Sequence, residues 1–464
     1  MIPLSAREER QPVMSSSDEV IIVGGGPVGS VLALFLARRG LKVDVFDRDS
    51  GLRTDLSIRP TVNLTLCERG LRVLRTLGVE EQVREATVPL YGRAVHGLDG
   101  STTFQPYGNS REALQCISRN KLYEMLLRCA QQQPGVTYHF GQRCLDVDLE
   151  SNTLTFQDLQ TGTTIQRQAQ RIVGADGAFS IVRQRLQRSS RFDYSQQFFP
   201  HSYVELTVPL QPGGRPPFER NAIHFWPDGE VGLLGMPNFD GSLMLMLQLP
   251  AEGGDCSFEG LRTPDDVQRL FTERFPQLVP LMPDLTTEFF SRRPNPLVTI
   301  RCSPWFHQDK VVLVGDAAHA LVPFYGQGIN AGFEDCATLD ECLTTHEGAW
   351  GPAFRDYSRL RKPNLDLISD LALQHFWELR ERVGDPSFHL RRKLERKVNS
   401  LYPDKYQSLY SMISFTPMSY VEAWKKEQEH QALIEQLMRL DDIEQRWDGP
   451  EVEAAIHQMM GSRR

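Results

Sequence analysis

The sequence lacks the features of several protein classes. Its eight cysteines include no Cys-x-x-Cys pair, so no metal site is expected, and their scatter favours reduced thiols in a reducing compartment. No window offers about 18 uninterrupted apolar residues, and residues 1–17 are too polar for a signal peptide. A formal net charge of −8 leaves no basic surface for nucleic acid. These absences predict a cytoplasmic protein with no membrane span and no nucleic-acid partner.

The composition is that of a globular enzyme-sized chain. Hydrophobic residues make up 40% and charged residues 24% of 464 residues, which allows two or three domains around a large core. Neither an internal repeat nor a low-complexity tract is present.

The first informative motif follows a short apolar run. Residues 19–23 predict a buried parallel strand, residues 27–39 a helix, and residues 42–47 a second strand. Between the first two lies a Gly-x-Gly-x-x-Gly motif formed by Gly24, Gly26 and Gly29, which permits a tight turn and aims a helix N-terminus at a pyrophosphate. Asp47, eighteen residues after Gly29, is placed to accept from a ribose hydroxyl and favours FAD or NAD over NADP. The alternative is a glycine-rich turn without a ligand.

A second motif lies nearly three hundred residues later. Residues 310–315 predict another buried strand, and Asp316 at its end is placed to bind the ribityl hydroxyls of a flavin. Gly326, Gly328 and Asn330 would bring backbone amides to the flavin pyrimidine edge. The alternative for Asp316 is a capping residue of a structural turn. For His319 a structural role is favoured over a catalytic one.

The remaining patterns divide the chain into cofactor and substrate parts. Residues 114–129 predict a helix, residues 136–156 a pair of strands, residues 172–175 a strand, and residues 192–249 an antiparallel sheet. From residue 352 onward the chain is mainly helical, with breaks near Pro403 and Pro417. The fold class is therefore α/β: a Rossmann-like FAD-binding domain, an inserted mixed or antiparallel substrate-binding sheet, and a C-terminal helical region. The expected boundaries are 18–90, 112–190 and 291–351 for the cofactor domain, 91–111 and 191–290 for the substrate domain, and 352–464 for a helical cap.

Several stretches carry a family resemblance. The sequence resembles the single-component FAD-dependent aromatic hydroxylases of the para-hydroxybenzoate hydroxylase class, and within it the kynurenine 3-monooxygenases, from about Glu19 to Trp424. The class is carried by residues 24–29, 173–183 and 314–330, and the subfamily by residues 62–66, 191–197, 200–206 and 330–336.

The resemblance implies further cofactor contacts and a substrate site. The FAD contacts that it adds are Val28, Phe46, Arg48, Arg119, Cys144, Asp176, Gly177 and Ile329. For Arg119 the alternative is a surface ion pair. Arg93 and Tyr107 match an Arg–Tyr pair that binds the carboxylate of the amino-acid substrate, and Tyr410 matches a further pocket tyrosine. From the residues alone, a surface arginine and a core tyrosine would be the better interpretation of Arg93 and Tyr107.

Several positions depart from the resembled pattern. His375 stands where these hydroxylases usually place Asn beside the amino-acid group of the substrate. Pro60 replaces an arginine, with Arg59 shifted by one position. Leu243 and Gln248 stand where the subfamily tends to carry Phe. These departures leave the identity of the aromatic ring open.

The resemblance also implies the reaction. Tightly bound FAD would be reduced by NADPH as co-substrate and react with O2, and the flavin C4a-hydroperoxide would hydroxylate L-kynurenine to 3-hydroxy-L-kynurenine. The preference for NADPH over NADH is implied by resemblance only, because the chain has no second dinucleotide motif. No catalytic base is required, a monomer or homodimer is expected, and the C-terminal anchor of mitochondrial relatives is not expected here. Three alternatives stay open: a hydroxylase of a substituted kynurenine or related amino-aryl acid, an FAD or NAD dehydrogenase that does not use oxygen, and a non-catalytic FAD-binding protein.

Overall fold

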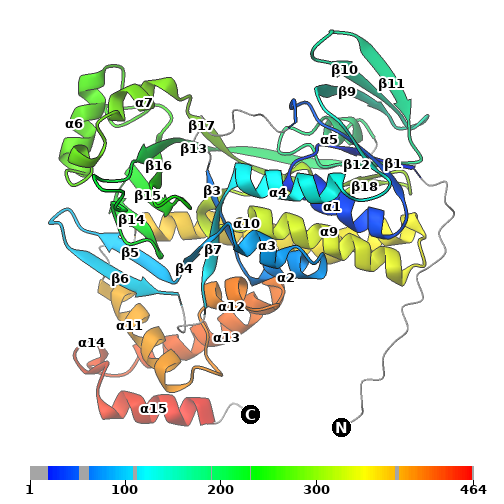
Figure 1. The fold of residues 1–464 in the computed structure, drawn as a ribbon. Helices are drawn as coiled ribbons and strands as arrows, with labels where there is room; N and C mark the ends of the chain where they lie inside the picture. The colour runs from blue at the N-terminus through cyan, green and yellow to red at the C-terminus, as the bar shows by residue number, and fades with distance from the viewer. Residues whose placement is uncertain are drawn as a thin grey trace.

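The fold combines a parallel sheet, a long mixed sheet and a C-terminal group of helices (Figure 1). The computed structural model describes residues 19–51, 62–107, 112–189, 191–229, 231–381 and 386–461. Within these ranges, no helix is long and apolar enough to cross a membrane.

The parallel sheet is the one predicted from the first motif. Five strands run parallel and one short edge strand runs antiparallel, in the order β18 (Phe306–His307), β19 (Val311–Leu313), β12 (Arg171–Gly174), β1 (Glu19–Val23), β2 (Lys42–Phe46) and β8 (Val136–His139). The predicted strands at residues 19–23, 42–47, 172–175 and 310–315 are confirmed to within two residues at each end. Their near-continuous apolar character fits a sheet that is covered on both faces.

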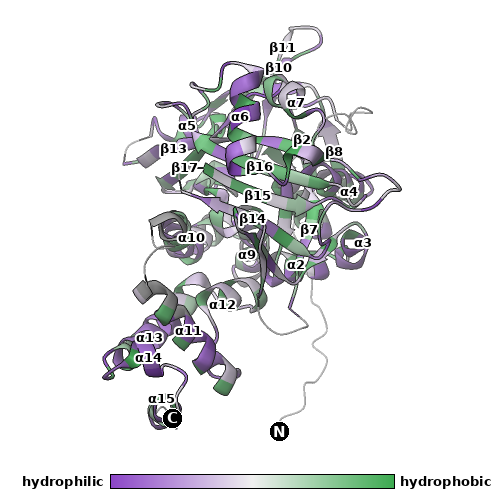
Figure 2. Ribbon diagram, turned by 90° about the vertical axis from the view of Figure 1, so that its left-hand side faces the viewer, coloured by the Kyte–Doolittle hydropathy of each residue, from purple (hydrophilic) through white to green (hydrophobic). Residues whose placement is uncertain are grey.

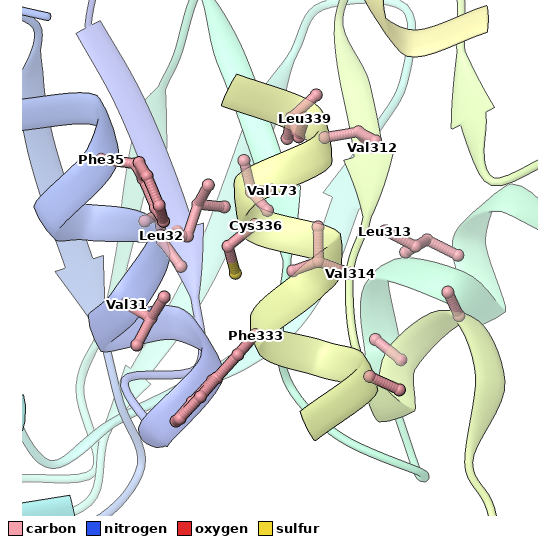
Figure 3. Packing of buried hydrophobic residues seen from close by; sticks show 14 of the residues in the cluster. Val31, Leu32, Phe35, Val173, Val312, Leu313, Val314, Phe333, Cys336 and Leu339 are labelled. Atoms are coloured by element: carbon pink, nitrogen blue, oxygen red, sulfur yellow. The ribbon is translucent and has the colours of Figure 1, made fainter. Parts of the chain in front are cut away.

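Two helices from distant parts of the sequence cover one face of this sheet. Helix α1 (Pro27–Arg38) and helix α9 (Gly328–Thr345) lie side by side, and Val31, Leu32 and Phe35 of α1 meet Phe333 and Cys336 of α9 above the strands (Figure 3). These five residues are at most 4% exposed. A small sheet packs against the same core through buried residues of β9 and β10. It contains β9 (Gln142–Asp148), β10 (Thr153–Asp158) and β11 (Thr164–Gln168).

The second large sheet has seven strands. Their order is β17 (Asn295–Ser303), β13 (Asp193–Val208), β16 (Leu243–Pro250), β15 (Val231–Pro237), β14 (Ala222–Asp228), β5 (Gly92–His96) and β6 (Thr102–Pro106). The β5–β6 hairpin, blue in Figure 1, joins the green strands through the parallel pairing of β5 with β14. Figure 2 shows the hydrophobic colouring of β15 and β16, in contrast to the hydrophilic helices α13 and α14.

Residue alternation gives this sheet two different faces. On β16, Leu243, Leu245 and Leu247 pack toward the helices α6 (Pro264–Arg274) and α7 (Leu285–Ser291), whereas Met244 and Met246 pack toward a third sheet. That third sheet contains β3 (Asn63–Leu66), β7 (Leu114–Ser118) and β4 (Val88–Leu90). The substrate sheet was predicted, but α6 and α7 within it were not.

The predicted helix over residues 114–129 is wrong in its first five residues. Residues 114–118 form β7, the central strand of the three-stranded sheet, and helix α4 (Arg119–Gln131) begins only after it. Ser118 caps this helix by accepting a hydrogen bond from the backbone N–H of Lys121 at 3.2 Å. The run of β7 is buried at four successive positions, so it lacks the alternation of a half-exposed strand and cannot be distinguished from a helix by its periodicity.

The remaining elements are helical. They are α2 (Glu68–Thr76), α3 (Glu80–Arg84), α5 (Ile181–Leu186), η1 (Val279–Leu281), α8 (Asp316–His319), η2 (Pro323–Tyr325), α10 (Trp350–Glu381), α11 (Pro386–Leu401), α12 (Leu409–Phe415), α13 (Tyr420–Met438), α14 (Ile443–Arg446) and α15 (Pro450–Gly461). The predicted helical C-terminal region, with breaks near Pro403 and Pro417, is confirmed.

A buried charge network connects the five helices α2, α8, α9, α10 and α13. Arg69 of α2 bonds to Glu334 of α9 at 2.5 Å, and Arg361 of α10 bonds to both Glu334 and Asp335. Asp335 also accepts from His319 of α8, and the Arg69 guanidinium stacks 4.0 Å over the ring of Tyr420 in α13. Both carboxylates have lowered pKa values in spite of their burial. Arg361 and Arg69 stabilise the charged form of Glu334, and His319 and Arg361 stabilise that of Asp335.

Removing one member of this network should destabilise the protein strongly. We expect Arg361→Met to lower the free energy of unfolding by about 3–5 kcal/mol, because two buried carboxylates each lose one cationic partner. Arg359→Met is the matched control: Arg359 lies on the same helix, pairs with Asp356, and is 70% exposed, so little change is expected. Urea unfolding measures both, and equal effects would contradict the role of the network.

Candidate active site

The loop between β1 and α1 is shaped by two glycines that admit no side chain. Gly24 has a φ of +101°, and a Cβ there would lie 2.4 Å from the carbonyl oxygen of Ala175. A Cβ on Gly29 would lie 2.0 Å from the carbonyl oxygen of Gly24. A Cβ on Gly26 would meet nothing within 4 Å, so the outer side of the loop is open. The loop therefore presents backbone, not side chains, to the space beside it.

Helix α1 opens toward that space without a cap. Gly26 is its N-cap residue, no side chain accepts from its first amides, and its first turn holds no acidic residue. Helix α9, which begins at Gly328, likewise has neither a side-chain cap nor an acidic residue in its first turn. Uncapped N-termini carry partial positive charge and free N–H donors, which suits a phosphate or an anionic ring edge.

Asp47, which directly follows β2, is hydrogen-bonded to the glycine loop. Asp47 accepts from the N–H of Gly25 at 2.6 Å and from the N–H of Asp49 at 2.8 Å. Burial raises the pKa of Asp47 above its usual value. Arg48 is exposed, and the ring of Phe46 stacks on His139 and Phe156 in the core, at 4.3 and 4.0 Å. Phe46 therefore presents only its backbone to the loop, where its carbonyl accepts from the N–H of Gly24 at 2.8 Å.

The two glycine-bearing motifs meet at Val28. A Cβ on Gly315 would lie 3.2 Å from Val28, and a Cβ on Gly332 would lie 2.7 Å from it. The thiol of Cys336 lies 3.5 Å from the Val28 carbonyl oxygen, to which it donates. The side chain of Val28 thus fills the space that the two distant glycines leave, and a single site contains both motifs.

Asp316 directly follows Gly315, next to this contact. Its side chain is exposed, yet the protein around it raises the pKa of the carboxyl group by burial. Arg119, exposed at the first position of α4, is near enough to Asp316, Tyr203 and Glu205 to stabilise their charged forms.

Asp176 and Gly177 supply a polar corner of the same site. Asp176 accepts from the N–H groups of Ile181 and Val182 through one oxygen, at 2.7 and 3.3 Å. Its other oxygen is buried and accepts from no donor in the described chain. Gly177 has a φ of +79° and opens onto free space. Burial, and then Asp176, raise the pKa of the nearby Cys144 thiol to about 12, so this cysteine contributes packing and not a thiolate.

The start of α9 is held by the amide of Asn330. This side chain donates to the carbonyl oxygens of Thr65 and Gly326, at 2.8 and 3.0 Å, and accepts from the N–H of Cys67 at 3.0 Å. Asn330 is fully buried, so only the backbone around Gly328 and Ile329 faces the open side. An unsatisfied aspartate oxygen, uncapped helix termini and open glycine surfaces together fit an FAD molecule.

The residues predicted to bind substrate lie together. The guanidinium of Arg93 lies 5.5 Å from the ring of Tyr107 and 5.0 Å from that of Tyr410, and the two rings stack at 5.3 Å. Tyr325, just before the α9 loop, lies 5.6 Å from Tyr410 and 5.2 Å from His375. The cluster thus continues from the substrate sheet to the loop at the start of α9.

The electrostatics of this cluster suit an anion. Across the described chain, no carboxylate forms an ion pair with Arg93, which is only half exposed. The Tyr107 hydroxyl is buried without a hydrogen-bond partner among the described residues, and burial raises its pKa, so it stays a neutral donor. A guanidinium without a carboxylate partner, next to a buried phenol, can receive one carboxylate.

The residues that depart from the resembled pattern lie in different parts of the structure, and two of them are on opposite faces of β16. Leu243 belongs to the sheet face that packs on α6 and α7, so its side chain points away from the cluster. Gln248 is on the other face and lies 3.4 Å from the sulfur of Met246. Arg59 and Pro60 lie outside the described residues.

Sequence reasoning missed two components of the site. Tyr325 lies inside the second motif, but no local pattern distinguishes it from the flanking glycines. The strand Leu243–Pro250 alternates Leu and Met, and this alternation could have shown which side chains face the site. His319 is buried and bonded to Asp335, as a structural histidine would be.

Comparison with known proteins agrees with this geometry. The FAD binding domain family matches residues 17–364. A kynurenine 3-monooxygenase of Christiangramia forsetii is 39% identical over 443 residues, which cover 96% of this chain and 99% of the relative. The kynurenine 3-monooxygenases of Salinispora tropica and Dictyostelium discoideum are 40% and 35% identical, over 90% and 91% of this chain and 93% and 94% of the relatives.

Two solved structures share the fold at lower identity. The tetrameric form of 2-methyl-3-hydroxypyridine-5-carboxylic acid oxygenase superimposes with a TM-score of 0.63 at 24% identity, over 80% of this chain and 94% of that one. The complex of Pseudomonas aeruginosa PqsL with 2-aminobenzoylacetate gives 0.63 at 21% identity, over 79% and 97%. With a matched FAD binding domain and extensive identity to these relatives, the chain belongs to the kynurenine 3-monooxygenase family of FAD-dependent monooxygenases.

Proposed function

We propose that this protein hydroxylates L-kynurenine to 3-hydroxy-L-kynurenine with NADPH and O2. The observation that carries the proposal is the cluster of Arg93, Tyr107 and Tyr410, in which a half-buried cation has two tyrosine rings beside it and no carboxylate partner among the described residues. Kynurenine offers a carboxylate for Arg93 and an aniline ring for the apolar residues nearby. The kynurenine 3-monooxygenase names of the relatives support the same substrate.

The cofactor residues are proposed from the geometry of the open surfaces. The amides of Gly26, Val28 and Gly29 would hold the pyrophosphate, in a turn whose shape depends on Gly24. Asp47 and the backbone near Phe46 and Arg48 would hold the adenosine ribose. Arg119, Asp176, Gly177 and Asp316 would hold the ribityl chain and phosphates, with Cys144 packing beside the adenine. The backbone of Gly328, Ile329 and Asn330 would meet the isoalloxazine.

The protein's share of the chemistry is orientation and exclusion of water. When bound, reduced flavin would supply the electrons that activate O2, and the transferred oxygen atom would come from that O2. The amino group of kynurenine makes its ortho ring carbon electron-rich, so a correctly placed ring needs no catalytic base. Met236, Met244 and Met246, each at most 5% exposed, form a dry layer behind Tyr107 and Tyr410. Water in this region would divert reducing equivalents to hydrogen peroxide.

Turnover of kynurenine tests the proposal. We expect FAD-loaded protein to consume NADPH and O2 when L-kynurenine is added and to form 3-hydroxykynurenine in matching amounts. Rapid NADPH loss that yields only hydrogen peroxide would exclude kynurenine as the substrate. NADPH loss without oxygen uptake would contradict the monooxygenase reaction.

Gly29→Ala should abolish tight flavin binding. The new Cβ would lie 2.0 Å from the carbonyl oxygen of Gly24, so the loop must move away from the pyrophosphate position. We expect at least about a tenfold loss of bound flavin, measured by absorbance after desalting. Gly461→Ala, where a Cβ meets nothing within 4 Å, is the control and should retain full flavin content.

Arg93→Ala should weaken kynurenine binding by about 2–5 kcal/mol, because the substrate carboxylate loses its cationic partner. Titration of the flavin spectrum with L-kynurenine measures the change. Arg274→Ala is the control, because Arg274 lies on α6, on the far side of the sheet, and pairs with Asp228. An unchanged affinity in Arg93→Ala would remove Arg93 from the substrate site.

A second candidate substrate is a ring-substituted kynurenine or a related amino-aryl acid. Gln248 favours this second substrate. Its amide lies next to Met246 on the face toward the site, whereas an unsubstituted ring would be better matched by an apolar residue there. His375, beside Tyr325, adds a second polar group. A ring-hydroxylated or halogenated kynurenine with a higher kcat/KM than kynurenine itself would identify this alternative.

We also propose a cytoplasmic location, a monomer or homodimer, and the six segment boundaries predicted from the sequence. The eight cysteines, all within the described ranges, are free, which supports a reducing compartment. Size-exclusion chromatography with light scattering tests the oligomeric state.

A further inference from the structure

A pair of buried histidines lies on the sheet face opposite Arg93. His96 is on β5 and His224 on β14, and they are 8% and 1% exposed. Nε2 of His96 lies 2.9 Å from Nδ1 of His224. The ring of His96 stacks on Trp226 at 4.4 Å, and Phe218 closes the group edge-on at 5.4 Å from His96. This pair is outside the site described above and has no assigned role.

The direction of each hydrogen bond follows from the outer partners. Nε2 of His224 lies 2.8 Å from the carbonyl oxygen of Glu219, which can only accept, so this nitrogen carries the proton. Nδ1 of a neutral His224 is then an acceptor, and Nε2 of His96 must donate to it. Nδ1 of His96 in turn accepts from the hydroxyl of Thr102 at 3.1 Å. The result is a one-way chain from Thr102 through His96 and His224 to Glu219.

Both histidines are neutral in this chain. Burial, and then His224, lower the pKa of His96 to about 4, and burial lowers the pKa of His224. A proton on Nδ1 of His224 would place two donors against each other. The chain is therefore complete at neutral pH, with one tautomer for each ring.

The chain connects the strands that carry the proposed carboxylate site. Arg93 lies three residues before His96 on β5, and Tyr107 directly follows β6. This hairpin is the edge of the seven-stranded sheet and is attached by four residue pairs between β5 and β14. Ala94 is opposite His224 and Arg93 is opposite Ile223, so a slip by one residue would turn Arg93 to the wrong face.

We infer that the Thr102–His96–His224–Glu219 chain is a positioning device that sets the register of the β5–β6 hairpin, and with it the position of Arg93 and Tyr107 for the substrate carboxylate. The histidines act through the hairpin and do not touch the substrate. The inference rests on the proposed function, in which Arg93 binds that carboxylate. It predicts that damage to the chain weakens carboxylate binding while flavin binding and the ring pocket persist.

The test compares L-kynurenine with kynuramine, its analogue without the carboxylate, on the FAD-loaded enzyme. His224→Leu removes both hydrogen bonds of the central ring and should raise the Kd of L-kynurenine about tenfold, with the Kd of kynuramine changed less than about twofold. His224→Gln retains one acceptor and one donor and should stay within about threefold of the wild type. His457→Phe, which removes a histidine bonded to Tyr402 in the C-terminal helices, is the control and should change neither Kd.

Each outcome decides a different point. An unchanged Kd of L-kynurenine in His224→Leu, or an equal rise for both ligands, would overturn the positioning role. If His224→Leu does not fold, Thr102→Val removes only the exposed end of the chain and should still raise the Kd of L-kynurenine about threefold; no rise would overturn the inference. An Arg93→Ala enzyme that binds L-kynurenine normally would instead refute the proposed carboxylate site itself.

Discussion

The structure depends on the contact between Val28 and two glycines from the other end of the cofactor domain. Gly315 and Gly332 lack the side chains that would collide with Val28, so the start of α1 can lie against the turn after β19 and against α9. The buried charges of Glu334 and Asp335 then fix α9 against α2 and α10. The proposed FAD site, composed of two segments nearly three hundred residues apart, requires this close approach.

The two faces of the seven-stranded sheet have different packing partners. Its leucine face packs on α6 and α7, and its methionine face closes the site behind Tyr107 and Tyr410. The histidine chain lies on the supporting face, directly behind the strand that presents Arg93. In the function proposed above, recognition of the substrate carboxylate depends on residues on both faces of this sheet edge.

Much of the fold could be predicted because its signals are local. The first strand, the glycine turn and the helix 27–38 follow from apolar runs and the Gly-x-Gly-x-x-Gly spacing. Residues 114–118 were predicted wrongly, because a short apolar run has the same appearance in a buried strand and in a helix. The cluster around Arg93 could be predicted only through family resemblance, since its members come from β5, the position after β6 and the helices η2, α10 and α12. The histidine chain depends on pairing between β5 and β14, which no local pattern indicates.

The origin of the oxygen atom in the product tests the central claim most directly. We predict that turnover of L-kynurenine under ¹⁸O₂, with FAD-loaded protein and NADPH, gives 3-hydroxykynurenine whose new hydroxyl group carries ¹⁸O. A hydroxyl group labelled from H₂¹⁸O instead, or label found only in hydrogen peroxide, would contradict it.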